Sequence, residues 1–469
     1  MFIKKYVNKN HISNLIFFML FAIVFLFIFF TMDYNDGRIN ASLGYVLCRG
    51  VLTGTLWEVY SGIAWSYGVV IYVIYAIWSL PVVVIDLING TTVDFNTAVW
   101  SILWYKLLLV LFWGACCYWF YKIQIELNSN KSVSRLSLMF LVTSGLMIIP
   151  TIALTQCDVM SLNFALMGVY YLLKKDNKRF VMYFAIAATM KYLALFIFLP
   201  LLLFQFKKIV RLAMVGVAGI SLTILMFGIQ MLSKQSLISA TSGSEYYVNT
   251  HIGKLFSSSI LTIGKLEISI FIVFLLTLCL VAYMVRTEQL DRSQFQAWVL
   301  WIAVSGWYAL LLFYEANIYW FILLMPFLIL LFSNNPDRIK ENVFLEIIFT
   351  NAVLLKYILH QGWTFGGERT FSGLLLKNLV PSEPNSLFSF IDIMTGQRYS
   401  KPYPPIISVI IFSAFAILII NNPFSNKNGL RHTLENGEQE KVLKMGIISH
   451  LVILYGWVLL IVVAQFLKI

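Results

Sequence analysis

The chain has 469 residues, of which 60% are hydrophobic and only 12% are charged, and its formal net charge is +12. Ordinary soluble domains are roughly 45–50% apolar and about 25% charged, so this composition excludes a soluble enzyme, a disordered chain and a coiled coil. The apolar residues come in long blocks, which leaves a multi-spanning helical membrane protein. Most Lys and Arg residues lie in short segments between these blocks, so the net charge reflects the positive-inside rule and does not indicate nucleic-acid binding.

The first external loop is the first feature that the charge pattern defines. The block 14–30 follows three lysines, which predicts a retained anchor with a cytoplasmic N-terminus. The segment 33–97 should then lie outside, because the next basic segment, 122–135, must return to the cytoplasm. If both apolar blocks between these segments crossed the membrane, the segment 122–135 would lie outside. The aromatic-rich block 63–88, which Pro81 interrupts, is therefore predicted not to span. We therefore expect interfacial helices in the loop 33–97.

A second stretch that does not fit a simple alternation of spans lies in the middle of the chain. The apolar stretch 180–206 has basic clusters on both sides, at 174–179 and 207–211. A single span would violate the positive-inside rule, whereas two half-helices folded as a hairpin satisfy it, with Lys191 and Tyr192 at the turn. A Lys in the middle of an apolar block is a candidate functional residue.

Ten further apolar blocks alternate across the membrane: 98–121, 136–154, 159–173, 212–231, 268–285, 296–313, 318–332, 343–359, 406–420 and 445–467. We therefore predict an all-α polytopic protein, with one integral membrane domain over 1–469, about eleven full transmembrane helices and the broken hairpin. The transmembrane core covers 98–333. An external loop is expected at 360–405, where it could serve as a substrate cover, and a cytoplasmic loop is expected at 421–444.

Carboxylates and amides gather on the predicted external side. Asp33 and Asp36 follow the first span directly, and a carboxylate at the membrane surface can act as a general base toward a sugar hydroxyl, or simply solvate a helix end. Gln156 and Asp158 open a later span, where an acid is also a favourable helix cap. Sequence spacing alone leaves both interpretations open.

Cations on or near the same side point to a phosphate group. Lys191 can bind a lipid phosphate as a compact cation, or extend its ammonium to an interface. The loop 360–405 carries Arg369 and Arg398, which the positive-inside rule places on the unexpected side. A phosphate or pyrophosphate partner would account for them.

The external cluster of Glu315, Asn317 and Tyr319 has side chains that can hold sugar hydroxyls and stack on sugar faces, although it also fits an aromatic belt. Motifs of nucleotide-binding enzymes, zinc proteases and serine hydrolases are missing from the sequence. The five cysteines have no metal-ligand spacing, so the sequence predicts no metal site.

In their order, these motifs resemble the polyprenyl-phosphate-sugar-dependent glycosyltransferases of the GT-C fold, in particular bacterial members and the mannosyltransferases of glycolipid-anchor assembly. The resemblance covers about residues 30–330. The matching positions are Asp36, Gln156-Cys157-Asp158, Lys191 through Pro200, Asn317, Tyr319 and Pro326-Phe327. Three positions depart from the family pattern: Thr155 stands where Gly is usual, Met190 where an aromatic is common, and Ile318 where Pro is frequent.

The resemblance implies a GT-C-like fold and an inverting transfer of a sugar from a polyprenyl-phosphate donor to a lipid-linked or cell-envelope glycan acceptor. The reaction would take place on the extracytoplasmic side of a bacterial plasma membrane, or of an endoplasmic reticulum membrane. Asp36, or its neighbour Asp33, would be the general base. No cofactor is required, and a weakly bound divalent cation stays open. The implied substrate-binding residues are Gln156, Asp158, Lys191, Tyr192, Glu315, Asn317, Tyr319, Arg369 and Arg398.

Two other functions stay open. An O-antigen-type polymerase or ligase uses pyrophosphate-linked donors and has an external loop rich in Arg and His, whereas this chain has five His in all. A transporter or flippase for lipid-linked sugars predicts internal symmetry, which the sequence does not show, although Lys191 in a broken segment fits it in part. Release of polyprenyl phosphate would require an enzyme, whereas movement of the intact donor would require a transporter.

Overall fold

The computed structural model describes residues 9–63, 65, 67–95, 98–127, 130–236, 260–263, 266–313, 317–360, 404–424 and 436–466. The described residues are mainly helical, which confirms the predicted all-α class, and they include one short antiparallel strand pair, β1 (Ile260–Ile263) and β2 (Leu266–Ser269).

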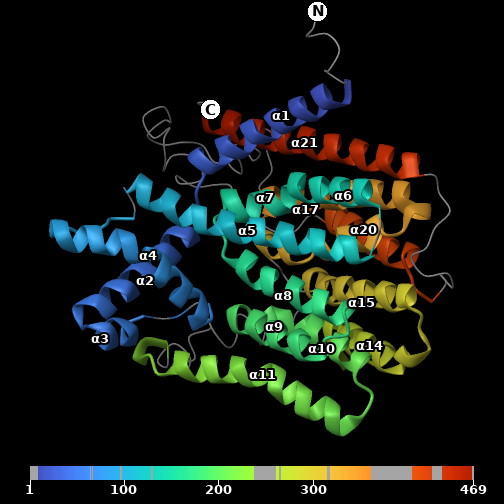
Figure 1. Cartoon of the computed structure of the whole chain (residues 1–469), viewed down its shortest axis with the longest axis horizontal. Coiled ribbons are helices and arrows are strands. Elements are labelled where there is room, and N and C mark those ends of the chain that lie inside the picture. The colour runs from blue at the N-terminus through green and yellow to red at the C-terminus, as the bar shows by residue number, and fades with distance from the viewer. Residues whose placement is uncertain are drawn as a thin grey trace, which may run out of the picture.

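The helices follow one another along the chain, and most of the longer ones run side by side (Figure 1). They are α1 (Lys9–Thr31), α2 (Asn35–Thr53), α3 (Leu56–Ser61), α4 (Val69–Asn89), α5 (Val99–Leu127), α6 (Lys131–Thr143), α7 (Gly145–Ile148), the π-helix η1 (Ile149–Ala153), α8 (Asp158–Leu173), α9 (Asn177–Met190), η2 (Tyr192–Ala194), α10 (Leu195–Gln205), α11 (Ile209–Met231), α14 (Ile270–Met284), η4 (Thr287–Gln289), α15 (Arg292–Phe313), η5 (Ile318–Leu323), α16 (Met325–Ser333), η6 (Pro336–Arg338), α17 (Ile339–His360), α20 (Pro404–Ile420) and α21 (Asn436–Phe466).

Several helices are suited to the bilayer. Among the described residues, α4, α5, α11, α15 and α21 are each long and apolar enough to cross a membrane, which gives five spans, or seven if two bent helix pairs count as one span each. The shorter apolar helices α8, α10, α14 and α20 add to this set. The chain is therefore a multi-pass membrane protein. The predicted eleven spans are not confirmed, because several of the predicted blocks fold as helices shorter than 18 residues.

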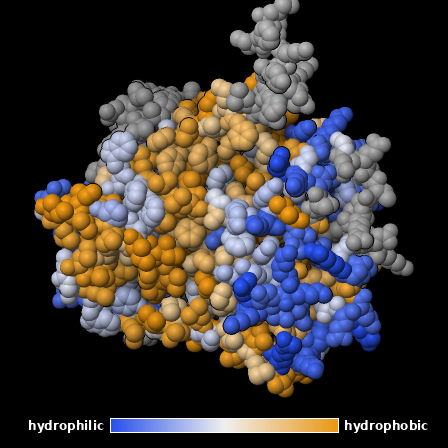
Figure 2. Space-filling model, viewed as in Figure 1, coloured by the Kyte–Doolittle hydropathy of each residue, from blue (hydrophilic) through white to orange (hydrophobic). Residues whose placement is uncertain are grey.

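The surface and the interior of the bundle differ as a membrane protein requires. Apolar side chains cover much of the surface in Figure 2. Only 6% of the most apolar 18-residue stretch of α11 is buried inside the protein. By contrast, 89% of the corresponding stretch of α15 is buried, so α15 lies in the core. An outer helix with an apolar surface on nearly all sides is stable only if lipid covers it.

On the face shown in Figure 2, most of the hydrophilic surface gathers at one end of the bundle, which we call the basic end. The connections from α10 to α11 and from α14 to α15 lie there in Figure 1. At this end Glu126 pairs with Lys174, which follows α8, and with Arg292, which begins α15. These pairs fix three connections on the same side of the membrane.

The predicted hairpin is confirmed. The α9 helix stops before Lys191, whose backbone is extended, and α10 then returns alongside α9. Gln205 Nε2, at the far end of α10, donates a 2.9 Å hydrogen bond to Asn177 Oδ1 at the start of α9. Halfway along, the rings of Phe184 and Phe198 stack with centroids 5.4 Å apart. Since a helix rises 1.5 Å per residue, Lys191 lies about 21 Å from the basic end, within a bilayer core of about 30 Å.

The segment 33–97 contains the helices α2, α3 and α4, as expected, but α4 continues through Pro81, so the predicted interruption there is wrong. A proline removes one helix hydrogen bond, but α4 stays continuous here and is held against α5 by a reciprocal pair of tryptophan contacts. Trp104 Nε1 donates to the carbonyl of Trp78 and Trp78 Nε1 donates to that of Trp104, both at 2.9 Å. Because α4 is long and apolar enough to cross a membrane, its length does not distinguish an interfacial helix from a span.

Candidate functional site

The centre of the candidate site is an ion pair between two helix ends. Asp158 is the first residue of α8, and Lys191 caps the C-terminus of α9. The Lys191 ammonium donates to Asp158 Oδ1, and both side chains are buried, with 7% and 1% of their surface exposed. Each residue lies at the helix end whose partial charge stabilises it. The structure thus brings together two residues that the sequence predicted separately.

Three aromatic rings surround the ammonium of Lys191. Its Nζ lies 4.8 Å from the ring centroid of Trp320, 5.4 Å from that of Tyr319 and 5.9 Å from that of Tyr67. Tyr319 also accepts a 2.6 Å hydrogen bond from Asn317 Nδ2. Since aromatic faces attract cations, this enclosure stabilises a charged Lys191 away from bulk water.

A second carboxylate is linked to this centre by a chain of hydrogen bonds. Gln156 Nε2 donates to Asp36 Oδ2 at 3.1 Å, and the Tyr67 hydroxyl donates to Gln156 Oε1 at 3.2 Å. Burial raises the pKa of the Tyr67 phenol well above its usual value, so this hydroxyl keeps its proton and remains a donor. Tyr67 therefore sets the orientation of the Gln156 amide, which in turn presents its N–H to Asp36. Asp36 is half-buried and is the more accessible of the two carboxylates.

The loop that carries Gln156 has an unusual backbone. Thr155 has φ 50°, in the left-handed region that favours glycine. The first turn of α2 packs tightly against this residue: a Cβ atom on Gly37 would lie 1.9 Å from Thr155 Oγ1. This close approach brings Asp36, the neighbour of Gly37, within reach of Gln156.

A second glycine, Gly68, positions Tyr67. A Cβ atom on Gly68 would lie 1.7 Å from the carbonyl oxygen of Thr189, near the end of α9. Only glycine allows this approach between the chain entering α4 and the tip of the hairpin. Tyr67 is thereby held over Lys191.

Asp33 belongs to a different cluster. It is fully buried, pairs with Arg38, and lies at the junction of α1 and α2. Arg38 also donates to the carbonyl of Phe95, and Lys106 donates to carbonyls in the last turn of α1 and to that of Met32. Cations that bind the terminal carbonyls of a helix stabilise its end. The arrangement makes Asp33 part of the support of the α1–α2 junction, while Asp36 faces Gln156.

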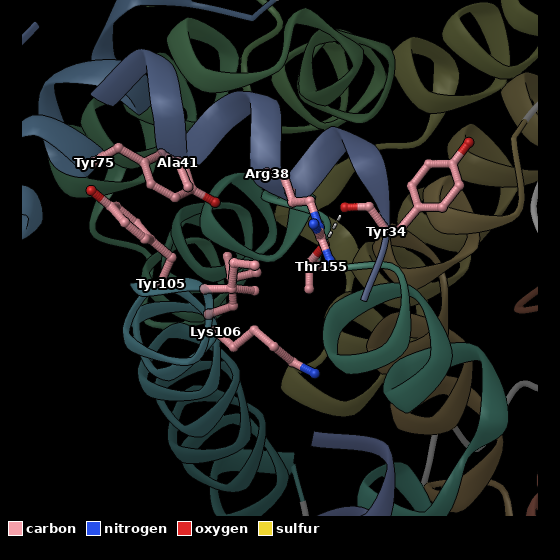
Figure 3. A pocket seen from close by; sticks show the side chains of 10 residues that line it. Tyr34, Arg38, Ala41, Tyr75, Tyr105, Lys106 and Thr155 are labelled. Carbon is pink, nitrogen blue, oxygen red and sulfur yellow. Dashed lines mark hydrogen bonds between the residues drawn. The ribbon is translucent and has the colours of Figure 1, made fainter. Parts of the chain in front are cut away.

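A small cavity lies beside the cluster of Asp33, Arg38 and Lys106. Figure 3 shows it between Tyr75 and Tyr105 at one end and Arg38 and Thr155 at the other, with Lys106 also lining it. It leaves about 10 Å³ for the centre of a water molecule. That is room for about one water and not for a sugar or a phosphate.

The remaining predicted site residues are placed as follows. Tyr192 begins η2 directly after Lys191 and is half-buried. Glu315, Arg369 and Arg398 lie outside the described residues. No group of three or more His, Cys, Asp or Glu side chains is arranged to hold a metal ion in the described parts of the chain.

Tyr67 and Gly68 contribute to the site and were not predicted. The sequence offered only a weak signal for them, because aromatic residues abound in the block 63–88 and fit a membrane interface equally well. Their role depends on contacts between segments far apart in the chain. A glycine directly after an aromatic residue is compatible with many turns.

The assembled group has a definite chemical character. Two carboxyl groups, those of Asp36 and Asp158, surround the single amine of Lys191, and the three groups interact electrostatically. A half-buried carboxylate that accepts an amide N–H can receive a proton from a nearby hydroxyl. The aromatic faces and the Asn317 amide offer the contacts that sugars use.

No protein-family model, curated protein or solved structure matches the chain. The function is therefore argued from the site itself.

Proposed function

We propose that the chain is a membrane glycosyltransferase that moves a sugar from a polyprenyl-phosphate donor to a lipid-linked or cell-envelope glycan acceptor. The site lies at the end of the bundle away from the basic loops, which would be the extracytoplasmic side, with a bacterial plasma membrane as the proposed location. The contact that carries the proposal is the hydrogen bond from Gln156 to Asp36, because it joins a candidate base to the buried Lys191–Asp158 pair.

Asp36 would act as the general base. Its carboxylate is partly accessible, whereas Asp158 is buried and already engaged by Lys191. In the proposed step, the acceptor hydroxyl gives its proton to Asp36 as its oxygen bonds to the anomeric carbon. The bond from that carbon to the phosphate oxygen breaks, and polyprenyl phosphate leaves with the electron pair. Attack from the face opposite the leaving group inverts the anomeric configuration.

Lys191 would stabilise the leaving phosphate. Its ammonium has three N–H donors, of which the Asp158 contact uses one. Asp158 would keep the ammonium charged and fixed in position, so the remaining donors are ready for the charge that develops on the phosphate. Tyr319 and Trp320 would pack against the sugar.

The lipid part of such a donor would find an apolar path. The described side chains of α14, α15 and α20 leave a groove of about 440 Å³, lined mainly by apolar residues such as Phe274, Phe313 and Phe415. Phe313 ends α15 just before the segment that leads to Asn317. A hydrocarbon chain in this groove would remain in contact with the bilayer.

The test is turnover of radiolabelled polyprenyl-phosphate sugars by the full-length protein in nanodiscs, with release of polyprenyl phosphate as the readout. Asp36→Asn keeps the size of the side chain and removes the base, so the rate should fall by about 10²–10⁴-fold. Asp176→Asn is the matched control, because Asp176 caps α9 at the basic end and Asn caps helices equally well. Full activity of Asp36→Asn would overturn the proposed base.

The alternatives give different results with the same labelled donors, assayed for cleavage in nanodiscs and for movement in reconstituted vesicles. Turnover of a pyrophosphate-linked donor only would indicate a polymerase or ligase. Movement of an intact labelled donor across a vesicle membrane, with no cleavage, would indicate a flippase. Either outcome rejects the proposed reaction.

A further inference from the structure

A buried break between two helices lies near the candidate site. The predicted span 136–154 is bent by 60° between α6 and α7, where Ser144 has an extended backbone. In an unbroken helix the Ser144 N–H would bond to the carbonyl of Phe140. Here it bonds to Leu141 instead, at 3.2 Å. The Phe140 carbonyl thus lacks its regular helix partner in the interior of a membrane protein, where unpaired polar groups are costly.

His450 of α21 provides that partner. Its Nδ1 lies 3.2 Å from the Phe140 carbonyl oxygen, and its ring packs on the Phe140 ring with centroids 4.2 Å apart. The hydroxyl of Thr143 is also within reach of this oxygen but lies closer to the carbonyl of Met139. Because a carbonyl oxygen only accepts hydrogen bonds, Nδ1 of His450 carries a proton.

The other ring nitrogen of His450 meets Glu346 of α17. His450 Nε2 and Glu346 Oε2 are 2.8 Å apart, and Thr350 donates to the second oxygen of Glu346 at 2.7 Å. Both His450 and Glu346 are fully buried. With Nδ1 protonated, one shared proton between Nε2 and Oε2 completes the pair, which is neutral overall. All of its polar atoms are then satisfied.

The chain leads directly from this break to the candidate site. After α7 comes the π-helix η1, whose Pro150 carbonyl accepts the backbone N–H of Gln156 at 3.1 Å. Both α7 and η1 pack on η5, which carries Tyr319 and Trp320. A shift of α7 would therefore displace groups on two sides of Lys191.

We propose that His450, held by Glu346, is a positioning residue for the candidate site. It binds the carbonyl at the α6–α7 break and so fixes the path of η1 and the placement of Gln156 and Asp158. This role couples the C-terminal helix to the site and does not depend on which reaction the site performs.

The test separates the two hydrogen bonds of the imidazole in the full-length protein. In a side-chain amide, His450→Asn can place an N–H where Nδ1 lies, whereas His450→Gln places one where Nε2 lies. The buried Cys157, between Gln156 and Asp158, reports on the loop through its rate of alkylation by N-ethylmaleimide, followed by mass spectrometry of its peptide. His450→Phe and His450→Gln should raise this rate about tenfold through local opening, and His450→Asn should restore it.

Two further variants keep the test decisive. Asn421→Leu removes buried amide contacts with Asn335 and Asn342, so it should lower stability without exposing Cys157. Glu346→Gln retains an acceptor for Thr350 and a donor for His450 Nε2, so it should leave the alkylation rate of Cys157 unchanged. This rate can be measured even if His450→Phe does not fold. Equal alkylation of the Asn and Gln variants of His450, or a rise in Glu346→Gln, would overturn the proposal.

Discussion

Lys191 and Asp158 neutralise each other where the end of one helix meets the start of another, 33 residues apart in the chain and away from the basic end. The pair closes the tip of the α9–α10 hairpin onto α8. Burial of two charges is costly unless they remain paired, so neither residue can be replaced alone without penalty. The same pair is the electrostatic centre of the proposed reaction.

The first prediction concerns this pair. Lys191→Met or Asp158→Leu alone should lower the free energy of unfolding by about 3–5 kcal/mol, because each leaves an uncompensated buried charge. The double variant should recover most of that stability and remain inactive, since the cation proposed to bind the phosphate is gone. Unfolding in a detergent–denaturant titration measures the first effect. Losses that simply add in the double variant would contradict the coupling.

The hairpin turn and the residues of its ion pair could be predicted from the sequence. The placement of Lys191 at a turn followed from basic clusters on both sides of one apolar stretch, and the contact between Gln205 and Asn177 confirms it. Charge at the ends of apolar blocks is a strong signal because a bilayer penalises its misplacement. The motif order also singled out Gln156, Asp158 and Lys191 as candidates, although not their mutual contacts.

The rest of the site depends on contacts that no local pattern specifies. Asp33 and Asp36 are three positions apart, yet one pairs with Arg38 and the other with Gln156. The break of the helix at residues 32–34 decides which carboxylate faces which partner. Tyr67 enters the site through the close approach of Gly68 to α9, which is a tertiary feature. Likewise, α4 continues through Pro81 while Trp78 and Trp104 join it to α5, a tertiary contact that the local sequence does not specify.

The second prediction uses the contact between α2 and the loop before α8. Gly37→Ala should abolish activity, because its Cβ would collide with Thr155 Oγ1 and push Asp36 away from Gln156. Thr155→Gly should be tolerated, since glycine adopts φ 50° without strain. Combining the two substitutions removes the colliding side chain and should restore activity to Gly37→Ala.

Thermal stability and turnover of the three variants in nanodiscs provide the measurement. Thr155→Val serves as the control, because it keeps the branched side chain at a positive φ and should not rescue Gly37→Ala. Rescue by valine as well as glycine would mean that the hydroxyl, and not the crowding, causes the defect.

The third prediction concerns Tyr67. Tyr67→Phe keeps the ring over Lys191 and removes the hydroxyl that orients the Gln156 amide. The amide can then turn its oxygen toward Asp36, so kcat should fall by about tenfold with little change in KM, as expected when an orienting contact is lost. Tyr60→Phe is the control, because it loses a comparable hydrogen bond to the Ile229 carbonyl without any contact with Gln156. Equal effects of the two substitutions on kcat would argue against an orienting role.

The fourth prediction concerns topology. Lys178 lies in the first turn of α9 and Lys208 follows α10, and both are exposed, so both should lie on the same side of the membrane. Cysteines introduced at these positions should react with a membrane-impermeant maleimide only in inside-out vesicles, because the positive-inside rule places this end in the cytoplasm. A single tilted span would expose the two positions on opposite sides, and labelling from opposite faces would therefore exclude the hairpin. Lys174, on the same end and before α9, gives the reference for the cytoplasmic face.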